Sequence, residues 1–264
     1  MEIIFIIIAI LLVLFLTFVW LISPNKKRNI PIAKAYAHRG LHGENIPENS
    51  LAAFKAAAVK GYGVEFDVQL TKDKKLVVFH DDSLFRMTGS DIAITDLTYT
   101  ELSKYRLNYT NEKIPLLDEV LEILADVPIL CEIKKQGDGT NVEICSYVAC
   151  ELDKYSGNIC IESFSPFILK WFAKNRPDFA RGQLSGDFFK IKSDLNPLSV
   201  FMVTNLLLNF LSRPDFIAYR YVDNSIGYRF CKKVYNTPTL GWTPIGEKQR
   251  EACRNNFDGE IFEL

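Results

Sequence analysis

The sequence has few residues of the kinds that build zinc sites, iron–sulfur sites or nucleic-acid surfaces. It contains only three histidines, and its six cysteines show no metal-finger spacing. The formal net charge is −1, so no overall basic field favours nucleic acid as a partner. The scattered cysteines also form no dense disulfide framework, which indicates a reducing compartment. No internal repeat or low-complexity segment is present.

Charge is absent from one long stretch. Residues 3–22 form an uncharged apolar run that, at roughly 1.5 Å per residue, is long enough to cross a hydrocarbon core of about 30 Å. A cleaved signal peptide is the competing interpretation. The run lacks a preceding basic residue, a small-x-small cleavage site and the following cysteine of a lipoprotein signal. We therefore predict that residues 1–31 are a transmembrane anchor with a basic linker.

Basic residues directly after this run predict its orientation. Lys26, Lys27 and Arg28 follow the apolar segment. The positive-inside rule places them in the cytoplasm, with a very short N-terminus outside. We therefore predict a single-pass membrane protein whose remaining residues, 32–264, form one cytoplasmic domain.

Strand-like and helix-like runs alternate along residues 32–264, a length typical of one α/β barrel. The strand-like runs are residues 35–38, 63–68, 129–133, 159–162, 180–184, 216–219, 237–242 and 258–262. This pattern predicts a (β/α)8 TIM barrel of eight parallel strands, preceded by one transmembrane helix. Residues 76–80 follow the second run too closely for a parallel crossover, so we expect a hairpin there, outside the barrel wall. Residues 81–114 are too few for a separate capping domain.

Three carboxylates lie in two of these strand-like runs. Glu65 and Asp67 are two residues apart, so the strand period points both to one face. Their neighbours Val64 and Phe66 are apolar, which favours an inward-facing pair over a solvated strand face. Burying two like charges is costly unless a cation offsets them, and Glu132 offers a third oxygen ligand. The sequence therefore predicts a metal site at the mouth of the barrel.

Two of the three histidines, His38 and His80, end separate apolar runs. A histidine in this place is often a hydrogen-bonded structural residue. Two such histidines near an expected metal site make an acid/base role the better hypothesis. We interpret His42 as a loop residue.

An ordered set of short motifs runs from about residue 35 to the C-terminus. They are residues 38–40 (His-Arg-Gly), 47–50 (Pro-Glu-Asn-Ser), Glu65-x-Asp67, 71–73 (Thr-Lys-Asp), 77–81 (Val-Val-Phe-His-Asp), Glu132-x-Lys134, 163–164 (Ser-Phe) and 242–243 (Trp-Thr). The set resembles the glycerophosphodiester phosphodiesterase family. This resemblance implies hydrolysis of glycerophosphodiesters to glycerol phosphate and an alcohol, with a divalent metal on carboxylates matching Glu65, Asp67 and Glu132. It also implies an acid/base pair matching His38 and His80.

The chemistry of the side chains agrees with this resemblance. All-oxygen ligation suits Ca²⁺ or Mg²⁺ better than zinc, and Mn²⁺ is a further candidate. Arg39 and Lys134 are assigned to the phosphate oxygens, with an ion pair as the alternative. Which histidine is the acid stays open. The nucleophile is either water or the neighbouring glycerol hydroxyl.

Other residues near the motifs have less defined roles. Asn49 or Ser50 is a candidate N-cap for an alanine-rich helix that starts at residue 51. Glu48 is a candidate supporting residue behind the metal ligands. Asn49 and Trp242 are further candidate site residues without an assigned role at the site.

Several alternatives stay open. The enzyme could act as a lysophospholipase D or a phospholipase C on membrane lipids, or the chain could be a silent, membrane-tethered lipid-binding module. Residues 198–211 are unusually apolar and form either a buried helix or one that lies on the bilayer. Members of the family commonly carry Thr-Asp near the end, which this chain lacks, so we expect closure of the last strand to be affected. The alcohol and the oligomeric state are not predicted.

Overall fold

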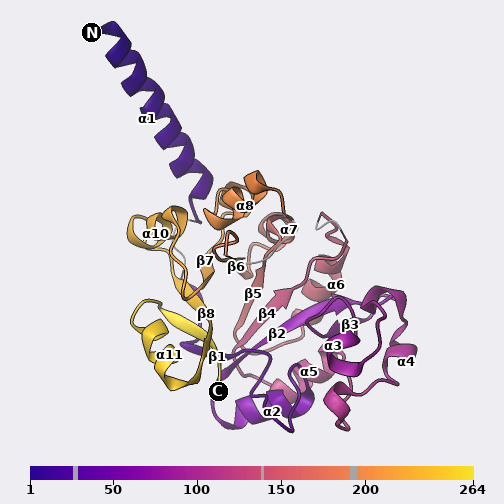
Figure 1. Cartoon of the computed structure of the whole chain (residues 1–264). Coiled ribbons are helices and arrows are strands. Elements are labelled where there is room, and N and C mark those ends of the chain that lie inside the picture. Colours follow the sequence, from indigo (N-terminus) through magenta and orange to yellow (C-terminus); the bar gives the residue numbers. More distant parts are fainter. Residues whose placement is uncertain (26–28, 138–139, 191–194) are drawn as a thin grey trace.

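The computed structural model describes residues 1–25, 29–137, 140–190 and 195–264. Its centre is a closed barrel of parallel strands with helices around it (Figure 1). The barrel strands are β1 (Ala35–Ala37), β2 (Gly63–Leu70), β4 (Ile129–Ile133), β5 (Ile159–Ser163), β6 (Ala180–Ser185), β7 (Phe216–Arg220), β8 (Thr239–Ile245) and β9 (Gly259–Glu263). β1 closes the ring by pairing with both β2 and β9. The predicted eight-stranded TIM barrel is therefore confirmed.

Helices cover the outside of this barrel. They are α2 (Leu51–Val59), α5 (Leu117–Leu124), α6 (Glu143–Leu152), α7 (Pro166–Asn175), α8 (Pro197–Thr204), α9 (Asn209–Ser212), α10 (Ile226–Lys233) and α11 (Gly246–Arg254). Alternate strand residues pack outward, as where Phe66 of β2 meets Phe54 of α2 with ring centroids 5.9 Å apart. The residues between them, such as Leu130 and Ile261, fill the barrel interior. Further along the strands the inward-facing residues become polar. These polar side chains lie at the carboxyl ends of the strands.

β3 (Leu76–Val78) forms the predicted hairpin with β2. It runs antiparallel to β2, with Leu70 opposite Leu76, and it is not a wall strand. The chain then forms short helices with a small apolar cluster of their own, which includes Leu84, Met87 and Ile94. These are α3 (Phe85–Thr88), η1 (Ile94–Asp96), α4 (Tyr99–Leu102) and η2 (Leu107–Tyr109). The insertion packs beside the hairpin.

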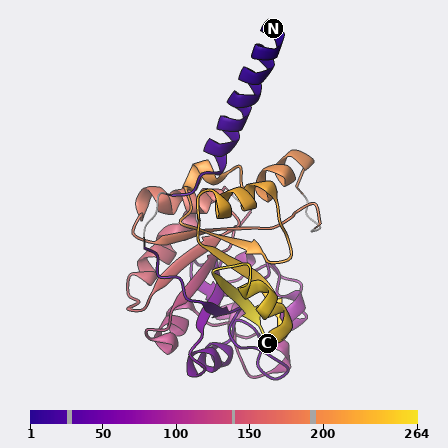
Figure 2. The same cartoon turned by 90° about the vertical axis from the view of Figure 1, so that its left-hand side faces the viewer.

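α1 (Glu2–Ile22) projects away from the barrel in both views (Figures 1 and 2). Within the described residues it is the helix long and apolar enough to cross a membrane. Its last turn is nevertheless part of the folded body. Tyr235 donates a hydrogen bond to the carbonyl of Val19 at 2.9 Å, and Asn209 donates one to the carbonyl of Ile22 at 3.0 Å. The basic flank Lys26-Lys27-Arg28 lies outside the described residues, and the division of the chain at residue 31 stays a prediction.

The apolar stretch 198–211 is not one helix. α8 ends at Thr204, Leu206 adopts a left-handed backbone conformation with φ 59°, and α9 begins only at Asn209. Leu206 is buried, whereas Leu198 and Phe201 of α8 are 67% and 48% exposed. The stretch therefore contributes to the core in one half and to the surface in the other.

The last strand forms despite the missing Thr-Asp. β9 pairs with β8 through Leu240 and Gly259, and with β1 through Ala37 and Phe262. The expectation of impaired closure was wrong, because the ladder hydrogen bonds are made by backbone groups whatever the side chains. Glu263, the final residue of β9, consequently lies next to the residue that follows β1.

Candidate active site

Three carboxylates converge at the carboxyl ends of two neighbouring strands. Glu65 and Asp67 point into the barrel because Val64 and Phe66, their neighbours on β2, pack outward. The register of β2 and β4 places Asp67 beside Glu132. Each acid offers one oxygen, and these three atoms lie within 4.8 Å of one another. The tertiary structure therefore brings together the three residues proposed as metal ligands.

The electrostatics of this triad favour a bound cation. Burial raises the pKa of Glu65 well above its usual value, and repulsion from Asp67 and Glu132 raises it further. Burial likewise raises the pKa of Glu132. Burial would also raise the pKa of Asp67, but Lys134, His80 and other neighbours hold it below its ordinary range. Three buried carboxylate oxygens at this spacing fit a hard divalent ion, which would allow all three to stay ionised.

Two basic residues already balance part of this charge. Lys134 Nζ lies 2.9 Å from Glu132 Oε1 and 3.3 Å from Asp67 Oδ1. Arg39 Nε lies 3.4 Å from Asp67 Oδ2, and the Arg39 backbone N–H donates to Glu65 Oε2 at 2.9 Å. Both residues predicted to bind phosphate are thus held against the carboxylates at the site.

A tight turn after β1 makes the Arg39 contact possible. Arg39 and Gly40 both have left-handed backbone angles, with φ of 54° and 80°. A Cβ atom at Gly40 would lie 2.7 Å from the carbonyl carbon of Ala53 in α2. Only glycine fits this position without strain. The turn directs the Arg39 amide toward Glu65.

Each predicted catalytic histidine is paired with a carboxylate. His38 Nδ1 lies 2.6 Å from Glu263 Oε1, and its Nε2 lies 4.0 Å from Glu65 Oε2. His80 Nδ1 lies 2.6 Å from Asp81 Oδ1. Burial lowers the pKa of His38, although the hydrogen bond to Glu263 opposes this effect. An ionised carboxylate can only accept, so in each pair Nδ1 donates and Nε2 is left free to exchange protons.

The hairpin positions His80 through backbone contacts. Phe79 donates its N–H to the carbonyl of Asp67 at 2.9 Å. The Gln69 side chain donates to the carbonyls of Phe79 and Asp81, both at 2.9 Å. Gln69 is the next inward residue of β2 after Asp67, and sequence reasoning did not single it out. Its contacts hold the loop that carries His80 over the strand ends.

The structure distinguishes the two N-cap candidates that precede α2. Ser50 is the N-cap, because its hydroxyl accepts the backbone N–H of Ala53 at 3.1 Å. Asn49 instead donates its side-chain amide to Asp67 Oδ2 at 2.8 Å. Asn49 therefore orients a carboxylate of the triad, whereas Ser50 stabilises the helix.

Glu48 links two arginines at the rim of the site. It accepts from Arg39 Nη1 at 2.8 Å and from Arg86 Nη2 at 2.6 Å. Arg86 also binds Asp81, the partner of His80, through Nε at 2.6 Å. This network connects the turn after β1 with the hairpin. Glu48 does not contact the triad itself but binds Arg39, which does.

Two further acidic residues at the site were missed by sequence reasoning. Glu263 follows Ile261 by two residues, and Glu162 follows Cys160 by two, so both continue the inward faces of their strands. The alternation of side chains along a strand is the sequence signal that could have identified both residues. His42, interpreted as a loop residue, lies with Nε2 3.8 Å from Glu263 Oε1.

A cavity of about 300 Å³ lies at this end of the barrel. Its lining residues are His38, Arg39, Glu65, His80, Glu132, Glu162, Phe164, Leu184, Trp242, Thr243 and Ile261. It combines both histidines, carboxylates of the triad and an aromatic wall. Trp242, the candidate without an assigned role, belongs to that wall.

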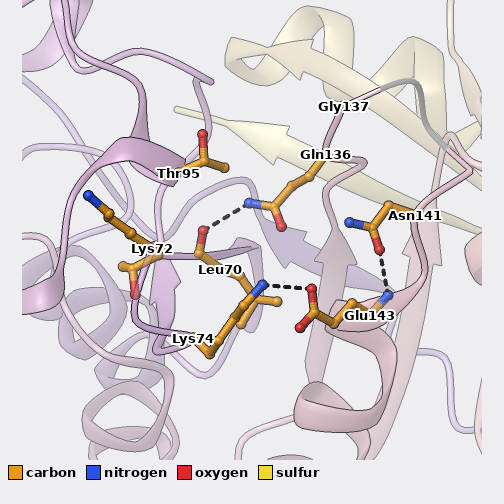
Figure 3. A pocket seen from close by; sticks show the side chains of 9 residues that line it. Leu70, Lys72, Lys74, Thr95, Gln136, Gly137, Asn141 and Glu143 are labelled. Carbon is orange, nitrogen blue, oxygen red and sulfur yellow. Dashed lines mark hydrogen bonds and ion pairs between the residues drawn. The ribbon is translucent and has the colours of Figure 1, made fainter.

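A second cavity of about 300 Å³ lies beside the hairpin (Figure 3). Gln136 donates to the carbonyl of Leu70 at 2.9 Å, Lys74 pairs with Glu143 at 2.6 Å, and Asn141 accepts the Glu143 N–H. These contacts connect the hairpin to the segment after β4. The second cavity contains neither predicted histidine and none of the triad.

Comparisons with known proteins agree with this geometry. The model of the glycerophosphoryl diester phosphodiesterase family matches residues 38–187. The chain is 35% identical over 158 residues to a glycerophosphodiester phosphodiesterase of Caldanaerobacter subterraneus subsp. tengcongensis, covering 56% of this chain and 65% of that protein. It is 38% identical over 134 residues to a lysophospholipase D of Homo sapiens, covering 46% of this chain and 42% of that protein. The matches thus span less than two thirds of these relatives.

Solved structures are similar over more of the chain. A glycerophosphodiester phosphodiesterase from Thermotoga maritima has a TM-score of 0.65 and 26% identity, covering 89% of this chain and 95% of that one. An Oleispira antarctica phosphodiesterase, solved with the product sn-glycerol-3-phosphate, has a TM-score of 0.71 and 23% identity, covering 88% and 93%. The family match includes the turn after β1, the triad and the hairpin histidine. The chain belongs to the glycerophosphoryl diester phosphodiesterase family.

Proposed function

We propose that this protein is a metal-dependent phosphodiesterase that hydrolyses glycerophosphodiesters to glycerol phosphate and an alcohol. The observation that carries the proposal is the convergence of three carboxylates with two carboxylate-paired histidines at one cavity. A phosphodiester needs cationic stabilisation of its oxygens, a base for the attacking group and an acid for the leaving alcohol. The three carboxylates would hold the cation, and the two histidines would act as the base and the acid.

Glu65, Asp67 and Glu132 would hold the metal, with Ca²⁺ or Mg²⁺ as the expected ion and Mn²⁺ as a further candidate. The bound ion would supply positive charge to the phosphate oxygens. Asn49 would keep Asp67 oriented toward the ion. Lys134 and Arg39 add fixed positive charge beside the ligands, so the phosphate would meet cations from the protein as well.

The two histidines would share the proton transfers. His38 has the more buried side chain, 17% exposed against 32% for His80, and burial lowers its pKa. We therefore assign His38 as the base that takes the proton of the attacking hydroxyl, with Nε2 as the accepting atom. His80 would give a proton to the leaving alkoxide. The attacking hydroxyl belongs either to water or to the neighbouring glycerol carbon.

A lysophospholipase D activity is the second candidate function. It is favoured by the similarity to the human lysophospholipase D and by α1. Parallel assays on a soluble glycerophosphodiester and on the matching lyso-lipid would separate the two functions. A silent lipid-binding module is disfavoured, because the triad and both histidine pairs are intact.

We also propose that α1 anchors the protein in a membrane, with the barrel in the cytoplasm. An 18-residue window of α1 contains no buried residue and has a mean hydropathy of 3.3. A cleaved signal sequence would pass the same test of length and composition. The hydrogen bonds from Tyr235 and Asn209 to the last turn support a retained helix, because cleavage after the apolar run would remove their acceptors. The orientation depends on Lys26, Lys27 and Arg28, outside the described residues.

Metal dependence is tested by chelation and by Glu65→Gln. We expect full loss of activity in chelator, recovery with added Ca²⁺ or Mg²⁺, and weaker metal binding with slower turnover in the variant. Removing one of three repelling charges should at the same time raise the melting temperature of the metal-free protein. Glu122→Gln, an exposed site on α5, is the matched control. Full activity of chelated, metal-free protein would refute the proposal.

A further inference from the structure

The part of α1 that stands clear of the body is too short to cross a membrane by itself. Among the described residues, the ring contacts of α1 with the body begin at Phe15, which meets Phe230 of α10 with centroids 6.1 Å apart. Residues 2–14 of the helix are roughly 20 Å long, at about 1.5 Å per residue, whereas a hydrocarbon core is about 30 Å thick. If α1 spans a bilayer, residues 15–22 therefore lie in it as well, together with the body residues that contact them.

The contacts at the base of α1 are of the kind found at a membrane surface. Trp20 is 55% exposed and packs against Phe210 of α9, with centroids 5.2 Å apart. The guanidinium of Arg213 lies 5.1 Å from the centre of the Trp20 ring, and the hydroxyl of Tyr235 binds the last turn of the helix. Tryptophan, tyrosine and arginine are suited to the headgroup level, because each joins an apolar body to a polar tip. The base of α1 thus marks the level at which the body would meet the headgroups.

An exposed apolar helix face lies at the same end of the body. α8 has no charged residue. Its residues Val200 and Thr204 are buried, whereas Leu198 and Phe201, three positions apart on the outward face, are 67% and 48% exposed. Both views place α8 at the end of the body from which α1 projects (Figures 1 and 2). Large apolar side chains exposed beside an apolar span are typical of a membrane contact.

α10 lies on the other side of the base of α1 (Figure 1). Its outward side combines Phe230, which contacts α1, with the exposed residues Ile226, Arg229 and Lys233. A helix with both apolar and basic residues on its exposed side suits a bilayer that contains anionic lipids, because the apolar groups enter the interface while the charges reach the headgroups. We call the outward sides of α8, α9 and α10 around the base of α1 the docking face.

We propose that the docking face lies on the bilayer surface, so that the body is seated among the lipid headgroups. This inference rests on the proposed role of α1 as an anchor. The length of α1, the aromatic contacts at its base and the position of α8 all favour a phospholipid bilayer as the partner of this face. The few apolar side chains of the face would give only weak, reversible binding without α1. The docking face therefore sets the orientation of the body, and α1 supplies the attachment.

Lipid contact is mapped with a photoreactive lipid. Full-length protein is reconstituted into vesicles of phosphatidylcholine and phosphatidylglycerol that contain a phospholipid with a diazirine on its acyl chain near the headgroup. Mass spectrometry then identifies the labelled residues. We expect label on α1, on Leu198 or Phe201, and on α10. Val59 is the internal control and should stay unlabelled, because it is 79% exposed but ends α2, at the far end of the body from α1 (Figure 1).

The outcomes separate this inference from the proposed anchor. Label on α1 with none on α8, or label on α8 no stronger than on Val59, would overturn the docking face and leave the anchor intact. A second copy of this chain would then be the remaining candidate to cover α8. Absence of label from residues 2–14 would contradict the anchor itself.

The double variant Leu198→Glu with Phe201→Glu tests whether α8 holds the body on the bilayer. We expect lipid labelling of α10 to fall at least roughly threefold, because carboxylates resist transfer into the apolar region. Val59→Glu is the matched control. Neither Leu198 nor Phe201 lines the active-site cavity, so kcat/KM for a soluble glycerophosphodiester should not change. Unchanged labelling of α10 in a double variant that circular dichroism shows to be folded would refute the proposal.

Discussion

At the scale of single residues, the site consists of acids that would repel one another without positively charged partners. Glu65, Asp67 and Glu132 lie within 4.8 Å of one another and are contacted by Lys134 and Arg39. The two histidines face this charge from β1 and from the hairpin. Both predicted histidines, Arg39 and two acids of the triad line the cavity. Several of their partners lie far away in the sequence.

His38→Ala and His80→Ala should each reduce kcat by roughly 10²-fold or more, because each removes a proton-transfer group. Bound metal should change little, since neither residue belongs to the clustered carboxylates. The double variant should lose less than the product of the two single effects, because the pair acts as a unit. Steady-state kinetics and metal analysis check this, and near-normal turnover in either single variant would exclude that histidine from the mechanism.

Glu263→Gln should lower activity by roughly 10²-fold and shift its pH profile. The Glu263 carboxylate opposes the effect of burial on His38, so its loss should lower the His38 pKa further. If His38 must start neutral as the base, the acid limb of the kcat/KM profile then moves to lower pH. Glu263→Asp, which keeps the charge, is the control. A profile that stays in place, or that moves to higher pH, would exclude His38 as the base.

At the scale of elements, the turn between β1 and α2 connects backbone geometry to the proposed metal site. Gly40 has φ 80°, and its α-hydrogen faces the Ala53 carbonyl, where a Cβ atom would lie 2.7 Å away. The same turn directs the Arg39 amide to Glu65 Oε2 at 2.9 Å. The local conformation of this turn therefore affects the position of Glu65, a proposed metal ligand.

Gly40→Ala should lower the free energy of unfolding by roughly 1–3 kcal/mol, because of the left-handed angle and the clash with Ala53. It should also weaken metal binding, since the Arg39 amide moves with the turn. Thermal melting with and without metal measures both effects. Gly43→Ala is the matched control, because a Cβ atom there would meet nothing within 4 Å beyond its chain neighbours. Equal behaviour of the two variants would show that the turn is not strained.

At the scale of the whole molecule, α1 is both a candidate membrane span and part of the body. Its exposed length is free of charged residues after Glu2, whereas Ile22 is fully buried in a cluster with Tyr219 and Cys231. Arg213 donates to the carbonyl of Trp20 at 2.7 Å. α1 is therefore docked on the barrel by its last turn.

Truncation should separate these two roles. Removing residues 1–16 should release the protein from membranes and leave its melting temperature nearly unchanged, because the docked turn stays. Removing residues 1–30 should lower the melting temperature, since it exposes the apolar cluster around Tyr219. Full-length protein should resist carbonate washing, which does not disrupt hydrophobic insertion. Protease cleavage of the barrel in intact cells, or a soluble extracellular full-length protein, would contradict the proposed topology.

The sequence by itself determined the barrel, its strand positions and the inward direction of Glu65 and Asp67. These depend on local periodicity, which two or three neighbouring residues reveal. The hairpin was also predictable, because the short connection after β2 excludes a parallel crossover. The division of the apolar stretch 198–211 into two helices was not predicted. The two helices are separated at Leu206, whose left-handed backbone conformation cannot be inferred from hydropathy.

Only the tertiary structure decided which residues meet. Glu263 reaches His38 across 225 positions because barrel closure places β9 beside β1, and no local pattern encodes that adjacency. Glu162 joins the cavity because β5 lies next to β4 in register. The docking of α1 likewise depends on Arg213 and Asn209, about 190 positions away. Local sequence sets which face a side chain takes, whereas strand pairing around a closed ring sets its neighbours.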